Sequence, residues 1–197
     1  LGDMFTKEAY QLFKRLEFKS VLSRFEKNAD SYNDDELEKN FMIVEDLNEA
    51  ERVFALCESS DVAGVFAVPA KDGSLFAAAL SMSLGNNGSE ASKVNVKEMT
   101  VYIPVGGFMT AEYIADKVSH LAKKLHADGK HICFINLKEQ LNMLHIAEED
   151  NAEDVALMAY LLNPLKDAYQ YDDIARDFLC MLIKSKTDIL GKADYED

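Results

Sequence analysis

The stretch Val62-Ala63-Gly64-Val65-Phe66-Ala67-Val68-Pro69 decides the fold class of this 197-residue chain. An unbroken apolar run closed by a proline, which cannot donate a backbone hydrogen bond, is typical of a strand that is buried on both faces of a sheet. Two more apolar stretches, Leu75 to Leu84 and Val94 to Ile103, follow it. Between these two, residues 85–89 read Gly-Asn-Asn-Gly-Ser and tolerate the positive φ of a hairpin loop. We therefore predict a meander of three strands, with residues 62–68 as a central strand.

Shorter patterns on either side of the meander complete the domain. A strand is predicted at Phe41 to Val44 and a helix from Asn48 to Glu58. After the meander, Thr110 is suited to cap a helix that stops at Asp128-Gly129 and has the apolar stripe Ile114, Val118, Leu121 and Leu125. A strand from His131 to Ile135 then precedes helices predicted at residues 137–144, 153–162 and 172–182. This order predicts an α/β domain with a mixed sheet of about five strands flanked by helices.

The N-terminal region differs from this body in composition. Residues 1–27 show the apolar spacing of an amphipathic helix, and residues 28–40 are rich in Asp and Glu, which resist burial. We predict an N-terminal helix, an acidic linker and an α/β domain at residues 41–197 that is cut short at its C-terminal end. The apolar stripe of the helix is wider than one helix contact requires, and part of it is expected to face a neighbour: Phe13, Leu16, Phe18, Leu22 and Phe25.

Charge and composition restrict the classes of partner. The formal net charge is -14, from 21 Lys and Arg against 35 Asp and Glu. Because proteins bind nucleic acid mainly by exchanging counterions for Lys and Arg, the chain alone should bind DNA weakly or not at all. It has no apolar run of about 18 residues, so we expect no membrane helix. The three cysteines lie far apart and fit reduced thiols, so a cytoplasmic location is expected.

Short motifs for metal or nucleophile chemistry are absent or weak. The four histidines form no His-x-x-x-His pair and have no cysteine at ligand spacing, which favours an ordinary surface or structural role over zinc binding. No Gly-x-Ser-x-Gly motif is present. We interpret Gly106-Gly107 as a turn rather than a phosphate cradle. A solvated helix face is the preferred interpretation of four nearby lysines, Lys117, Lys123, Lys124 and Lys130.

Several short motifs occur along the chain in the same order as in a known protein family. They are Arg15-Leu16-Glu17-Phe18-Lys19, Val65-Phe66-Ala67, Val101-Tyr102-Ile103-Pro104-Val105 and Asn136-Leu137-Lys138. Together they resemble bacterial DNA polymerase I, a family A DNA polymerase, and residues 159–164 and 172–179 resemble the two helices that close its 3′-5′ exonuclease domain. The resemblance implies a ribonuclease-H-like fold. It also implies a parent protein that is a DNA-directed DNA polymerase, a nucleotidyltransferase of DNA replication and repair that uses Mg²⁺.

The resemblance further implies where exonuclease chemistry would lie. Active members hold two divalent metals with four carboxylates. Two of these form an Asp-x-Glu motif that matches Pro69-Ala70-Lys71 here, and a third matches Gln140. The fourth lies in the family on a later helix with a tyrosine nearby, and no such helix is found before Asp197. Pro69, Lys71 and Gln140 therefore predict a catalytically inactive domain, without a metal or cofactor of its own, that serves as a structural scaffold.

Two other hypotheses stay open. In the first, the domain is an active metal-dependent proofreading exonuclease with displaced carboxylates, formed by Asp61, Asp72, Glu139 and Asp154. In the second, the chain is a free-standing interaction protein unrelated to replication. Under the leading hypothesis the partners are the polymerase and 5′ nuclease domains of the same parent chain, and DNA is reached only through that parent.

Overall fold

The computed structural model describes residues 41–84, 97–147, 150–179, 181 and 183–195, together with isolated positions between residues 6 and 21. Contacts divide the chain into two compact units. Unit 1 comprises Leu1–Lys39 and Ala159–Lys192, and unit 2 comprises Asn40–Met158 and Ala193–Asp197. The predicted α/β domain of residues 41–197 is thus shared between both units.

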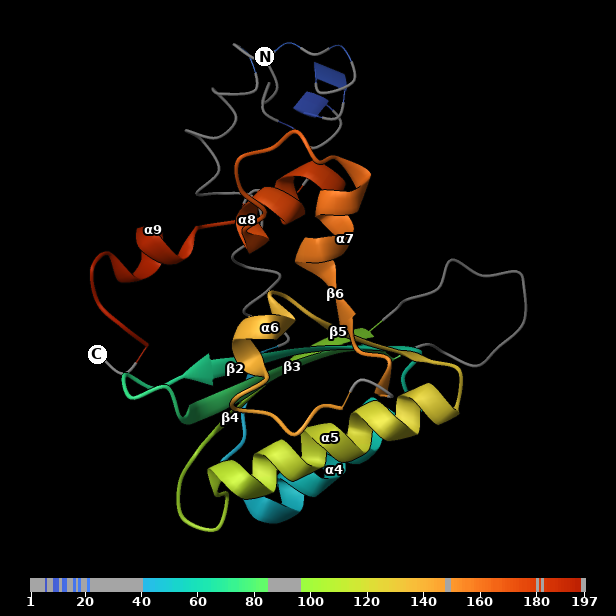
Figure 1. Ribbon diagram of the computed structural model, residues 1–197, viewed down its shortest axis with the longest axis vertical. Coiled ribbons are helices and arrows are strands. Elements are labelled where there is room, and N and C mark those ends of the chain that lie inside the picture. Colours follow the sequence, from blue (N-terminus) through green and yellow to red (C-terminus); the bar gives the residue numbers. More distant parts are fainter. Residues whose placement is uncertain are drawn as a thin grey trace. The chain divides into compact units, whose positions relative to one another are not determined.

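Unit 2 is built on a mixed β-sheet. The strands in the described part of the chain are β1 (Phe41–Ile43), β2 (Val62–Pro69), β3 (Leu75–Leu84), β4 (Lys97–Pro104), β5 (His131–Phe134) and β6 (Glu153–Asp154). They follow the spatial order β1-β4-β3-β2-β5-β6, and Figure 1 labels the strands from β2 to β6. β2, β3 and β4 are antiparallel neighbours, which confirms the predicted meander, whereas β1 is parallel to β4, β5 to β2 and β6 to β5. An antiparallel meander extended by parallel strands beside its first strand is the ribonuclease-H-like arrangement that was expected.

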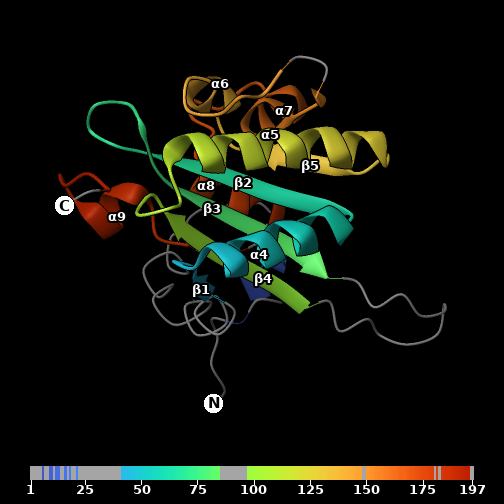
Figure 2. The same cartoon turned by 90° about the horizontal axis from the view of Figure 1, so that it is seen from below.

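Two helices cover one face of this sheet, and their side chains explain why. Helices α4 (Leu47–Ser59) and α5 (Ala111–Ala127) lie along the same face (Figure 2). The alanines of β2 that face the core, Ala63 and Ala67, are fully buried and leave room for close helix packing. Each of the four stripe residues predicted for α5 has at most 1% of its surface exposed: Ile114, Val118, Leu121 and Leu125. Burying one such side chain stabilises the fold by about 1.5–3 kcal/mol.

The boundaries of α5 agree with its local sequence signals. The Thr110 hydroxyl oxygen accepts a hydrogen bond from the backbone N–H of Tyr113 at 3.1 Å, so Thr110 is the N-cap that was predicted. At the other end, Gly129 adopts a φ of +69°, a conformation that favours glycine and ends the helix.

Two predicted helices differ from those observed. The helix predicted at residues 153–162 starts at Val155 as α7 (Val155–Leu162), because Glu153 and Asp154 form β6 beside β5. Five strands were expected, and β6 was missed because two residues are too few to show an alternating pattern. The helix predicted at residues 137–144 is reduced to the four residues of α6 (Leu137–Gln140).

The C-terminal segment is also more divided than predicted. In place of one helix at residues 172–182, the chain forms α8 (Tyr171–Ile174) and then a π-helical turn, η3 (Ala175–Leu179). A short helix that was not predicted, α9 (Lys186–Leu190), begins with a capping box between Ser185 and Asp188.

Part of the N-terminal prediction falls outside the described residues. Ala9, Tyr10, Leu12 and Phe13 are helical, and Tyr10 is buried. Leu16 lies in a turn and Phe18 has no regular structure, so the predicted helix is not continuous. Leu22 and Phe25, the linker at residues 28–40, residues 85–96 and Cys180 lie outside the described part. Among the residues that the structure describes, no helix is both long enough and apolar enough to cross a membrane.

Candidate functional site

The positions matched to nuclease carboxylates meet at one edge of the sheet. β2 and β5 are parallel neighbours, so their carboxyl ends lie side by side. Pro69-Ala70-Lys71 leaves the end of β2, and α6 with Gln140 follows the end of β5. In open α/β sheets this edge is where functional sites commonly form. The fold therefore brings the predicted positions together, although Pro69 is partly buried and Lys71 is exposed.

Gln140 forms a buried bridge between two parts of the backbone. Its side chain is 2% exposed. Its Oε1 accepts a hydrogen bond from the backbone N–H of Ala67 at 2.6 Å, and its Nε2 donates one to the backbone carbonyl of Ile135 at 2.5 Å. The pairing of β2 with β5 ends at Val65 and Phe134, so the next inward N–H of β2 needs another partner. The Gln140 amide supplies that partner, and both of its polar atoms are used in doing so.

Asp154 holds the starts of two helices. Its Oδ2 accepts a hydrogen bond from the backbone N–H of Leu137 at 2.9 Å. Its Oδ1 accepts from the N–H groups of Asn136 at 3.2 Å, Ala156 at 2.9 Å and Leu157 at 3.3 Å. These N–H groups belong to the first turns of α6 and α7, where a carboxylate is favoured by both hydrogen bonding and the helix dipole. Asp154 is therefore engaged in joining α6 to α7.

The other carboxylates of the displaced-site hypothesis lie apart. Asp72 belongs to the turn between β2 and β3, where its Oδ1 accepts hydrogen bonds from the Ser74 hydroxyl at 2.6 Å and the Ser74 N–H at 2.9 Å. These hydrogen bonds hold the pKa of Asp72 below its usual value, and the one from the Ser74 hydroxyl has the larger effect. Asp61 precedes β2 at the opposite end of the strand from Asp72. At the usual rise of an extended strand, roughly 25 Å separate the two ends. Glu139 is exposed on α6.

No three of Asp61, Asp72, Glu139 and Asp154 place ligand atoms within 4.8 Å of one another. Among the described residues, the group that meets this criterion is Glu112, Asp116 and His145, which includes none of the matched positions. Sequence spacing gave no sign of this group, because His145 is far along the chain from the two carboxylates.

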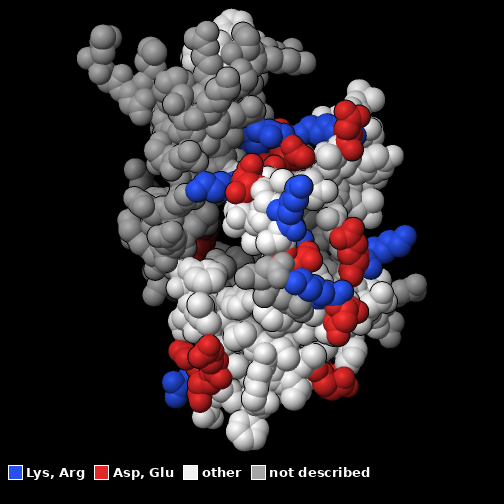
Figure 3. Space-filling view, turned by 90° about the vertical axis from the view of Figure 1, so that its left-hand side faces the viewer, with Lys and Arg blue, Asp and Glu red and all other residues white. Residues whose placement is uncertain are grey.

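Three of the four lysines on and near α5 are engaged with neighbouring oxygens. Lys117 forms an ion pair with Glu51 at 2.5 Å, Lys124 pairs with Asp128 at 3.1 Å, and the Lys130 ammonium donates to the carbonyl of Glu58 at 2.7 Å. Hydrogen bonds from Lys117, and next from Tyr113, hold the pKa of Glu51 below its usual value. On the face shown in Figure 3, basic side chains likewise lie among acidic ones. This arrangement is that of a solvated helix face rather than a continuous phosphate-binding surface.

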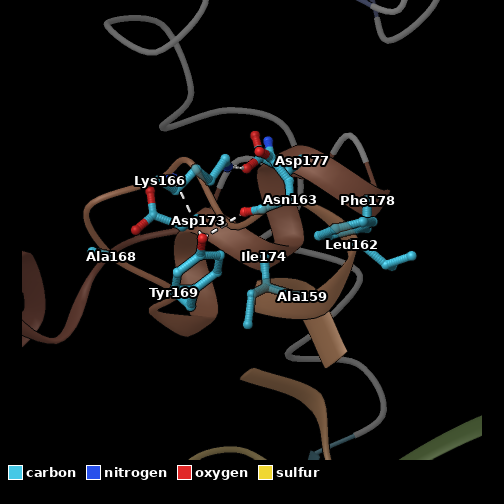
Figure 4. Close-up of a pocket in the computed structure, with 10 residues that line it drawn as sticks. All are labelled: Ala159, Leu162, Asn163, Lys166, Ala168, Tyr169, Asp173, Ile174, Asp177 and Phe178. Atoms are coloured by element: carbon cyan, nitrogen blue, oxygen red, sulfur yellow. Dashed lines mark hydrogen bonds and ion pairs between the residues drawn. The ribbon is translucent and has the colours of Figure 1, made fainter. Parts of the chain in front are cut away.

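Two hollows are lined by described residues, one in each unit. In unit 2, a groove of about 630 Å³ lies at the carboxyl ends of β1 and β4, where Glu45 and Asp46 meet Phe108, which is 89% exposed. In unit 1, a pocket of about 250 Å³ lies between the end of α7 and the α8–η3 segment (Figure 4). There the Tyr169 hydroxyl donates to the carbonyl of Asn163, and Lys166 is paired with Asp177. Tyr169, Asn163, Lys166 and Asp177 thus interact with one another within the lining of the pocket.

Comparison with known proteins gives a structural similarity alone. No protein-family description matches the sequence, and no curated protein matches it. The chain is similar to the crystal structure of the Aedes aegypti Nibbler EXO domain, with 12% sequence identity, a TM-score of 0.49, and coverage of 76% of this chain and 73% of that chain. The strand order and strand directions of unit 2 by themselves give it the ribonuclease-H-like α/β arrangement that was expected.

Proposed function

We propose that this chain is a catalytically inactive 3′-5′ exonuclease-like module of a bacterial DNA polymerase I, which supports the polymerase domain structurally. The observation that carries the proposal is the Gln140 bridge. At the position where the resemblance calls for a metal ligand, a neutral amide has both polar atoms committed to the backbone of Ala67 and Ile135.

The chemistry of the neighbouring positions supports the same conclusion. Hydrolysis by two divalent metals requires several oxygen ligands that carry negative charge. The Pro69 side chain offers no ligand atom, and the Lys71 side chain offers an ammonium group, which repels a cation. Asp154, which is half-buried, already accepts hydrogen bonds from four backbone N–H groups. Two exposed carboxylates, Asp72 and Glu139, do not make up a two-metal centre.

A scaffold role also agrees with the surface. The net charge of -14 and the paired lysines of α5 oppose tight binding of DNA by this chain alone. Helix α7 exposes apolar side chains to an unusual extent, with Leu157 at 56%, Leu161 at 71% and Leu162 at 73%. Apolar surface of this kind is expected to contact other protein. The proposed partners are the polymerase and 5′ nuclease domains of the same parent, a cytoplasmic enzyme whose polymerase reaction uses Mg²⁺.

An exonuclease assay tests the proposal. The purified chain is incubated with a 3′-labelled single-stranded oligonucleotide in Mg²⁺, Mn²⁺ or a chelator, beside a proofreading-proficient polymerase as the positive control. We expect no shortening of the oligonucleotide above the chelator level. Any metal-dependent activity is retested in the double variant Asp72→Asn, Glu139→Gln. Activity that this variant abolishes would establish a displaced nuclease site and overturn the proposal. Activity that it retains would be assigned to a contaminant only if a mock purification without the protein shows the same activity.

A further inference from the structure

Three side chains from two separate parts of unit 2 converge on its surface. Glu112 and Asp116 lie one turn apart on α5, and His145 lies in the segment that follows α6. Their ligand atoms all lie within 4.8 Å of one another, and His145 Nδ1 is 2.8 Å from Asp116 Oδ1. We propose that Glu112, Asp116 and His145 form a binding site for one divalent transition-metal cation, with Zn²⁺ bound more tightly than Mn²⁺.

The backbone that carries these groups is fixed by the core. On α5, Ile114 and Ala115 lie between the two carboxylates in sequence and are buried, which sets the helix face that carries Glu112 and Asp116. His145 follows Leu144, which is 2% exposed, and precedes Ile146, which packs against the same core. Both sides of the site are thus anchored to one hydrophobic cluster. Little ordering of the backbone is required when a cation binds, so little conformational entropy is lost.

The separations suit a single ion. Ligand atoms bonded to one Zn²⁺ at about 2.0–2.2 Å lie about 3 Å from each other. The His145 and Asp116 atoms are already at this separation, and the cation takes the place of the hydrogen-bonded proton between them, which is released to solvent. All three side chains are exposed, so rotation of the Glu112 side chain can close the remaining distance.

The ligand types indicate which cation is preferred. Imidazole nitrogen suits Zn²⁺ and other late transition metals, whereas Mg²⁺ and Ca²⁺ prefer sites made of oxygen alone. Two carboxylates at positions i and i+4 on one helix repel each other, and a divalent cation converts that repulsion into attraction. Because affinity rises from Mn²⁺ towards Zn²⁺ for such mixed sites, the order of affinity follows.

The consequence of binding is a cross-link between α5 and the segment after α6. A cation that binds the folded state alone stabilises it in proportion to the logarithm of its free concentration over Kd. The site would hold one ion and includes none of Pro69, Lys71 and Gln140, so it does not supply the two-metal chemistry of an exonuclease. It is independent of the proposed function and can be tested separately.

The test is metal titration of the full 197-residue chain after treatment with a chelator. Calorimetry with Zn²⁺ and with Mn²⁺ is compared for the wild type, for His145→Ala and Asp116→Asn, and for two controls. The first control, His120→Ala, removes an exposed histidine of α5 that lies 3.7 Å from Glu58. The second, Cys133→Ser, removes a thiol that is hydrogen-bonded to Glu153 and could bind zinc by itself.

We expect one zinc ion per chain, a Kd at least tenfold weaker in both site variants, and no change in either control. Zinc should also raise the melting temperature of the wild type and of His120→Ala but not of His145→Ala. Circular dichroism without metal confirms that each variant is folded. The proposal is overturned if the wild type does not bind zinc, if His145→Ala binds it unchanged, or if Cys133→Ser is the variant that loses binding.

Discussion

Replacing Gln140 with Glu is a direct test of the bridge at the sheet edge. An ionised Glu keeps the acceptor for the Ala67 N–H but turns its second oxygen towards the carbonyl of Ile135, which then lacks a donor. A buried carbonyl without a donor costs about 1–3 kcal/mol, and the buried negative charge adds to this cost. We therefore expect Gln140→Glu to lower the free energy of unfolding at pH 7 by about 2–4 kcal/mol.

The loss should depend on pH, because a protonated Glu can donate to Ile135 as the native amide does. Burial and the opposing carbonyl raise the folded-state pKa of the new carboxyl above its unfolded value of about 4.3. Between these two pKa values the folded variant holds more protons than the unfolded variant. Its stability relative to wild type therefore falls as pH rises, by up to about 1.4 kcal/mol per pH unit, and the difference disappears below about pH 4.

Urea unfolding followed by circular dichroism, from about pH 4 to pH 8, measures this difference. The matched control is Glu139→Gln, an exposed position on the same short helix, which should change stability by less than about 0.5 kcal/mol. A Gln140→Glu variant as stable as wild type at pH 7, or one whose difference from wild type does not vary with pH, would refute the bridge. Stabilisation of this variant by Mn²⁺ would instead show that position 140 can serve as a metal ligand.

Two further predictions concern Asp154 and Cys133. Asp154→Ala should lower the free energy of unfolding by about 2–4 kcal/mol, since the starts of two helices lose their hydrogen-bond acceptor. Asp154→Asn should lower it less, because the amide keeps one acceptor oxygen. Calorimetric melting measures both variants, and equal losses would contradict this role of Asp154. Burial, and next the Glu153 carboxylate, raise the pKa of the Cys133 thiol to about 11, so alkylation by iodoacetamide at pH 8 should be slow and should speed up several-fold in Glu153→Gln. Peptide mapping by mass spectrometry measures the alkylation rate at Cys133, with Cys57 as the control. Burial raises the pKa of the Cys57 thiol to about 12, and its alkylation rate should not change in Glu153→Gln.

Local sequence signals were enough to predict the framework of unit 2. The run from Val62 to Pro69 predicted a central strand because its side chains are apolar on both faces, and β2 indeed lies between β3 and β5. Thr110 and Gly129 predicted the ends of α5 because capping depends on residues within one turn of the helix. Such signals depend on residues that are close together in the chain, so they can be recognised from the amino-acid sequence alone.

The boundaries near Asp154 were decided by the tertiary structure. Residues 153–162 were predicted as one helix, but Asp154 is held by the N–H groups of Asn136 and Leu137, which lie 18 and 17 positions earlier. That contact fixes Glu153 and Asp154 in an extended form beside β5 before α7 can begin. A pattern of apolar spacing does not contain this information.

The chemistry of individual side chains shows the same division. From sequence, Gln140 could be recognised as a position without negative charge, because only the residue type is needed for that inference. Its role as a bridge appeared only when the fold placed it against Ala67, which is 73 positions away. His145 was assigned an ordinary role because no partner lies at ligand spacing in the chain, yet the fold sets it 2.8 Å from Asp116, across 29 positions. Sequence determines which donors, acceptors and charges exist, and tertiary packing determines which of them meet, because hydrogen bonding and metal coordination require contact within a few ångströms.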